Sequence, residues 1–140
     1  MNNLSFHITD ITANSIRANA SEIGLSVEEQ DARIVIRITD NGSGMDAETA
    51  RRVTNPFYTT RTTRKVGLGL PFLIQNAEQT GGSVTLTSEP GKGTDVRAVF
   101  HSDHIDCPPW GDLPGTVALL ITGNPEINVC FEYRSGETGY

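Results

Sequence analysis

The sequence lacks the features that mark several large classes of protein. No apolar run approaches the ~20 residues that a membrane-spanning helix needs. The N-terminus also lacks the charged and apolar regions of a signal peptide. Two of the 140 residues are cysteines, Cys107 and Cys130, so nothing indicates a disulfide-dependent secreted scaffold, and both thiols are expected to be reduced. We therefore expect a cytoplasmic protein that does not associate with a membrane.

Basic residues are also scarce. Eleven Lys and Arg stand against 17 Asp and Glu, and the net charge of −6 argues against nucleic-acid binding, which depends on neutralising phosphates. The acidity is local, because residues 101–140 contain six acidic residues and a single basic one, Arg134. What the chain does have is 36% hydrophobic residues and 14 glycines, a composition typical of one globular domain.

Apolar residues in the first hundred positions follow the spacing of helices in some segments and of strands in others. Leu4, Ile8 and Ile11 recur at helical spacing, whereas Ile34 and Ile36 alternate with polar residues as in a half-buried strand. The predicted elements are a helix over 4–20, paired strands over 23–27 and 34–38, a short helix over 46–53, a helix from about residue 70, and paired strands over 83–88 and 94–101. This order indicates an α+β fold, a two-layer sandwich with helices on one face of a mostly antiparallel sheet.

The C-terminal part continues the pattern after a Pro-rich connector over 101–114. Residues 115–122 and 127–134 are apolar and β-prone, and Gly-Asn-Pro-Glu separates them, which predicts a further β-hairpin. We expect this hairpin to pack on the sheet edge or against a partner. Residues 1–101 then form the main domain, and residues 102–140 form an extension packed on it.

A polar stripe runs along the first predicted helix. His7, Asp10, Asn14 and Arg17 recur at helical spacing, so their side chains lie along one side of that helix. Such a stripe is most often a solvated face. For His7 we expect a partly buried, structural histidine.

Three glycine-centred turns lie where loops meet helices or strands, and glycine there allows the backbone to approach a ligand closely. Two familiar phosphate loops are excluded. Residues 67–72 lack the third glycine of a dinucleotide fingerprint and a preceding strand, and residues 89–94 lack the spacing of a Walker loop. Any nucleotide site in this chain is therefore of another kind.

Five segments, taken together, carry a family resemblance. They are 10–15 (Asp-Ile-Thr-Ala-Asn-Ser), 40–45 (Asp-Asn-Gly-Ser-Gly-Met), 56–61 (Pro-Phe-Tyr-Thr-Thr-Arg), 67–70 (Gly-Leu-Gly-Leu) and 91–94 (Gly-Lys-Gly-Thr). In order and spacing they resemble the ATP-binding domain shared by gyrase, the ninety-kilodalton heat-shock chaperones, histidine kinases and MutL, the Bergerat fold, over about residues 4–101. The first segment is most similar to MutL and the last three are most similar to histidine kinases.

The resemblance implies roles for individual residues. Asp40 would accept a hydrogen bond from the adenine amino group, and Thr94 would support the same polar end of the pocket. Gly42 and Gly44 would let the backbone pass close to the base and ribose. Asn14 would be the ligand of Mg²⁺, a hard ion that prefers oxygen.

The phosphates would lie against Gly67, Gly69 and the N-terminus of the helix that follows. Residues 54–66 would form a lid over the nucleotide, in which Arg64 and Lys65 contact the triphosphate; docking to an acidic partner is the alternative for this basic patch. Phe57 is as compatible with core packing as with a nucleotide contact. The remaining nucleotide-binding positions that the family pattern implies are Met45, Leu68 and Leu70.

Asp10 occupies the place where hydrolysing members of the family have a Glu that activates water. An Asp is one methylene shorter, so it either acts as the general base or orients a water on Mg²⁺. The resemblance thus implies a protein that uses ATP and Mg²⁺ as a stand-alone kinase or ATPase module. A protein phosphoacceptor in trans is expected, and a homodimer is left open. The alternative is a non-catalytic switch in which ATP creates a docking surface for a protein.

Overall fold

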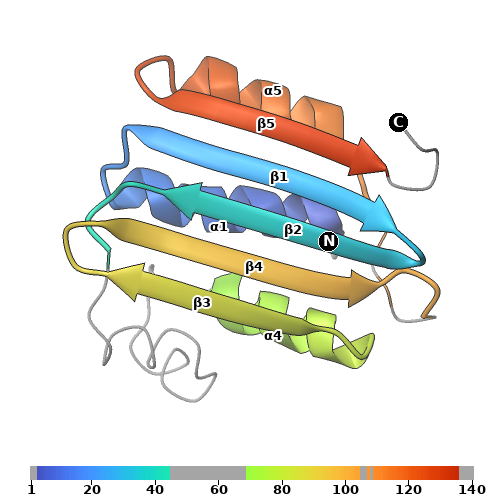
Figure 1. Cartoon of the computed structure of the whole chain (residues 1–140). Coiled ribbons are helices and arrows are strands. Elements are labelled where there is room, and N and C mark those ends of the chain that lie inside the picture. Colours follow the sequence, from blue (N-terminus) through green and yellow to red (C-terminus); the bar gives the residue numbers. More distant parts are fainter. Residues whose placement is uncertain (1–2, 45–68, 105–106, 108, 136–140) are drawn as a thin grey trace.

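Alternating apolar residues build a five-stranded sheet, and three helices lie along one face of it in the computed structural model (Figure 1). The structure describes residues 3–44, 69–104, 107 and 109–135. The elements in chain order are α1 (Leu4–Arg17), β1 (Glu22–Gln30), β2 (Arg33–Asp40), α4 (Gly69–Gln79), β3 (Ser83–Glu89), β4 (Gly93–His101), α5 (Leu113–Gly123) and β5 (Asn128–Ser135). The strand order is β3-β4-β2-β1-β5, and every pairing is antiparallel except that of β1 with β5. The predicted α+β sandwich is confirmed.

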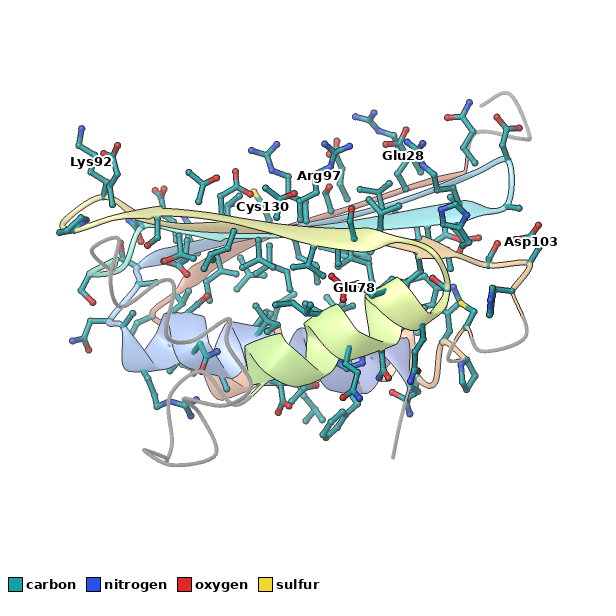
Figure 2. All side chains as sticks on the ribbon, turned by 90° about the horizontal axis from the view of Figure 1, so that it is seen from below. Glu28, Glu78, Lys92, Arg97, Asp103 and Cys130 are labelled. Atoms are coloured by element: carbon teal, nitrogen blue, oxygen red, sulfur yellow. The ribbon has the colours of Figure 1, made fainter. Side chains whose placement is uncertain are left out.

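The period-two pattern of the strands determines which face of the sheet is buried. Ile23, Leu25 and Val27 of β1 point toward the helices and are buried with every second residue of β2 and β4. Figure 2 shows the opposite face, where Glu28, Arg97 and Cys130 point away from the helices. One face of the sheet is therefore core, and the other is polar and open.

Helix α1 begins where its first backbone N–H groups find partners. The side chain of Asn3 accepts a hydrogen bond from the N–H of Phe6, and the N–H groups of Leu4 and Ser5 donate to the carbonyls of Pro109 and Trp110. These contacts satisfy donors that a helix start leaves free. The connector after β4 is thus part of the cap of α1.

The C-terminal hairpin was predicted wrongly. Residues 115–122 lie in helix α5 and not in a strand, whereas β5 matches the predicted second strand and pairs in parallel with β1. An apolar run of this length fits a buried helix or a strand equally well. The deciding signals are local, because Asp112 caps the helix by accepting from Gly115 N–H and Pro114 lies in its first turn.

None of the helices in these parts of the chain is long and apolar enough to cross a membrane.

Candidate functional site

Asp40 ends strand β2 on the face that carries the helices, because it continues the alternation of Ile36 and Ile38. Its carboxylate is held at two points. The hydroxyl of Ser15, on α1, donates to Oδ2 at 2.6 Å, and the N–H of Gly42 donates to Oδ1 at 2.9 Å. The half-buried carboxylate is therefore fixed between the helix layer and the sheet.

Thr94 is the direct neighbour of Asp40 across the sheet, in the antiparallel pairing of β2 with β4. The next strand adds Ser88, whose hydroxyl lies 2.9 Å from that of Thr94. Asp40 and Thr94 are predicted from the sequence, whereas Ser88 is a member of the same polar row that the sequence motifs do not indicate. The alternation of Val84 and Leu86 could have revealed it, because Ser88 is the next residue on their face.

The glycines of the 40–45 and 91–94 segments bring two loops together. A Cβ on Gly44 would lie 1.9 Å from the carbonyl oxygen of Glu89, and a Cβ on Gly93 would lie 1.9 Å from that of Asp40. Both glycines have positive φ, and Gly91 N–H donates to the Ser43 carbonyl at 2.7 Å. The close approach at Gly44 and Gly93 is between backbones, and it holds the end of β2 against the β3–β4 turn.

The polar stripe of α1 runs from a buried to an exposed environment. His7 has 1% of its surface exposed, and the side-chain amide of Asn76, on α4, donates to its Nε2 at 2.8 Å. Burial lowers the pKa of His7 to about 4, so the imidazole is neutral at physiological pH. His7 is thus a structural link between two helices, more deeply buried than expected.

Asp10 and Asn14 are the half-buried members of the stripe. Burial raises the pKa of the Asp10 carboxyl, and the positive charge of Arg17 partly offsets this rise. The Arg17 guanidinium also donates to Asn14 Oδ1 at 2.5 Å. Asp10 and Asn14 therefore present side-chain oxygen atoms one helical turn apart, and the oxygen of Asn14 is already hydrogen-bonded to the Arg17 guanidinium.

Helices α1 and α4 run in opposite directions, and the ends that face the Asp40 side of the sheet are the end of α1 and the start of α4 (Figure 1). The His7–Asn76 contact fixes their relative level. Asn14 lies seven residues after His7 in α1, and Gly69 lies seven residues before Asn76 in α4. Seven residues correspond to a rise of about 10 Å along each helix. Asn14 therefore lies at the level of the first turn of α4.

The predicted second glycine segment is described only in part. Helix α4 begins at Gly69, close to its predicted start. The side chain of Leu70 and the predicted helix over 46–53 lie outside the described residues. So do the lid over 54–66 and the predicted contacts Met45, Phe57, Arg64, Lys65, Gly67 and Leu68.

Comparison with known proteins bears on this arrangement. Residues 3–104 match the model of the family described as histidine kinase-, DNA gyrase B-, and HSP90-like ATPase. The chain belongs to this family. Membership confirms the resemblance drawn from the five segments, and it implies ATP binding by this histidine-kinase-like ATPase domain.

The relatives of this ATPase domain include sensor kinases. It is 29% identical over 104 residues to the sensor histidine kinase YxdK of Bacillus subtilis. The alignment covers 69% of this chain and 32% of that protein. It is 30% identical over 101 residues to sporulation kinase C of the same species. This alignment covers 71% of the chain and 23% of that protein. The chain thus spans about a third or less of the length of these relatives.

A solved structure shares the whole fold. The crystal structure of the N-terminal domain of a DNA repair protein aligns with a TM-score of 0.63 at 16% identity, covering 98% of this chain and 50% of that one. The alignment therefore extends past residue 104, where the family match ends, and includes most of α5 and β5.

Proposed function

We propose that this chain binds ATP with Mg²⁺ at the end of the sheet marked by Asp40, and passes the terminal phosphoryl group to a protein. The observation that carries the proposal is the fixed Asp40 carboxylate. Its two hydrogen bonds, from Ser15 and Gly42, hold an acceptor on the helix side of the sheet beside Thr94. A fixed, half-buried acceptor of this kind favours a base with an amino group, because a polar edge left unpaired there would be costly.

The triphosphate would extend from Asp40 toward the start of α4. The first N–H groups of a helix carry partial positive charge and suit phosphate oxygens. Gly69 opens α4, and Asn14 of α1 lies at its level. Adenine recognition and phosphate binding would thus be performed by elements whose ends meet at one side of the molecule.

The residues present fit a magnesium ion. Mg²⁺ prefers oxygen ligands and usually keeps several waters. Asn14 offers an amide oxygen, from which the Arg17 guanidinium would move away when the ion binds, and Asp10 offers a carboxylate one turn away. The parts of the chain that the structure describes contain no cluster of three or more His, Cys, Asp or Glu side chains suited to a metal. Bound with ATP, the ion would neutralise phosphate charge, and Asn14 would hold it.

Transfer to a protein is favoured over other uses of ATP by the kinase relatives. The two relatives described above, which align over 69% and 71% of this chain, are both named as kinases. Protein kinases rely mainly on positioning and electrostatic stabilisation of the transferred group. The acceptor would be a separate protein or a segment beyond this domain.

Hydrolysis is a second candidate, favoured by the environment of Asp10. Partial burial raises the pKa of this carboxyl toward the range where it works better as a general base. If Asp10 activates water, Asp10→Asn should abolish phosphate release and leave ATP binding measured without Mg²⁺ unchanged. If phosphoryl transfer to protein dominates, the same change should leave the phosphoprotein yield largely unaltered.

The test is calorimetric binding of Mg–ATP, followed by incubation with labelled ATP and separation of bound nucleotide, free phosphate and phosphoprotein. Asp40→Asn should lower the affinity at least about tenfold, since a carboxylate oxygen that accepts from the base is replaced by an amide N–H donor. Asn14→Ala should weaken binding with Mg²⁺ more than binding without it. Asp95→Asn is the matched control, because Asp95 lies on the open face bound to Arg37. Equal affinities for the wild type, Asp40→Asn and Asp95→Asn would refute the proposed site. Binding without any turnover would indicate the non-catalytic switch.

A further inference from the structure

In the part of the chain that the structure describes, strand β5 forms one edge of the sheet and pairs with β1 on one side only. Its eight residues, Asn-Val-Cys-Phe-Glu-Tyr-Arg-Ser, contain no proline. The register with β1 places Phe131 and Tyr133 on the helix side, and they are 40% and 47% exposed. Natural sheets usually protect such an edge with proline, charged side chains, short strands or covering segments, and β5 carries two charged residues, Glu132 and Arg134. The opposite edge, β3, is rich in Ser and Thr and exposes no large apolar residue.

Helix α5 lies beside the same edge (Figure 1) and is unusually apolar. Its eleven residues include no charged side chain. Val117 and Leu120 are buried, while Leu119 and Ile121 are 73% and 46% exposed. A helix that is apolar all round is normally buried all round. Among the described residues, five large hydrophobic side chains are exposed, and four of them belong to α5 and β5.

The charged residues on the open face of β5 can pair with the same residues of a second copy of this strand. Glu132 and Arg134 are two residues apart on the same face and 3.5 Å from each other. In an antiparallel pair of two β5 strands with Tyr133 on the two-fold axis, Glu132 of each copy lies opposite Arg134 of the other. With Glu132 on the axis, two carboxylates would face each other, and with Phe131 on the axis, Glu132 would face Cys130. Of these three registers, only the one with Tyr133 on the axis places each Glu132 opposite an Arg134.

We infer that the β5 edge is a homodimer interface, in which β5 of one copy pairs antiparallel with β5 of a second copy around Tyr133. The pairing joins two sheets into one continuous sheet and satisfies the outward N–H and C=O groups of residues 131–135 in both copies. Such an interface is isologous, so each favourable contact occurs twice. This interface lies at the opposite end of the strand order from β3 and does not include the proposed ATP site.

The test measures the mass of the 140-residue chain by sedimentation equilibrium at increasing concentration. The wild type should approach twice 15.1 kDa. Glu132→Arg and Arg134→Glu should each raise the dimer dissociation constant about tenfold or more, because two opposite-charge pairs become two like-charge pairs. An equimolar mixture of these two variants should recover the dimer, since arginines of one then face glutamates of the other.

Glu89→Arg provides the matched control. It makes the same charge change on an exposed residue of β3, at the other edge of the sheet, and should leave the dimer intact. Circular dichroism and thermal melting of each variant establish that the fold is retained. A mass of 15.1 kDa at every wild-type concentration up to ~1 mM would overturn the inference. A dimer that survives both single changes at β5, or fails only with Glu89→Arg, would also overturn it.

Discussion

The buried His7 should make the stability of this domain depend on pH in a way that a single substitution removes. Its pKa is lowered to about 4 by burial, against 6.5 in the unfolded chain. Between these values the unfolded state binds a proton that the folded state does not, so the free energy of unfolding decreases as the pH falls from 6.5 toward 4. The linkage relation gives a loss of about 2 kcal/mol between pH 7 and pH 5 from this one group.

The comparison is between the wild type and His7→Gln, unfolded with urea at pH 7 and at pH 5. The amide oxygen of Gln can still accept from Asn76, which now donates to His7 Nε2. His7→Gln costs stability at both pH values, but it should lose about 2 kcal/mol less than the wild type on acidification. Carboxyl groups with raised pKa, such as Asp10, are present in both proteins and cancel in the difference. Equal losses on acidification would show that the His7 imidazole is not kept neutral by burial.

Two further predictions concern the backbone at the site and the link to the connector. Gly93→Ala should destabilise the fold by at least ~2 kcal/mol more than Gly91→Ala, because the new methyl group would overlap the Asp40 carbonyl oxygen, whereas Gly91 has open space around it. Thermal melting of the two variants measures this difference, and equal melting temperatures would contradict it. Trp110→Phe should lower the free energy of unfolding by about 1–2 kcal/mol, because the indole N–H donates to Glu29 at 2.8 Å. Urea unfolding of this variant is compared with that of Glu29→Gln, which keeps an acceptor. An unchanged stability for Trp110→Phe would refute the prediction.

Sequence alone was sufficient for the elements whose pattern and local signals agree. The alternation of Ile34, Ile36 and Ile38 fixed both the strand and its buried face, and that face then carried Asp40 to the helix side. The stretch over 115–122 could not be assigned in this way, because its five consecutive apolar residues, 117–121, show no distinguishable period. Its helical state follows from Asp112 and from packing against α1.

The residues of the candidate site could be proposed from the sequence, but the contacts that hold them in place could not. The glycine segments and Asp40 were recognised from order and spacing, whereas the hydroxyls of Ser15 and Ser88 gain meaning only when α1 and β3 are placed against the sheet. The partner of His7 was equally hidden, because Asn76 lies 69 residues away in the sequence. Contacts of this kind depend on tertiary packing, which no local pattern records.

The cap of α1 has a consequence for how this domain folds. The carbonyl of Trp110 accepts from the hydroxyl of Ser5, 105 residues earlier, and β5 pairs with β1 over a similar separation. Such distant contacts slow folding, because the chain must close a long loop before they form. During synthesis, α1 and β1 emerge first, yet they lack the cap and the neighbouring strand until nearly the whole domain has been made. The part of this domain that is synthesised first is therefore among the last to reach its final environment.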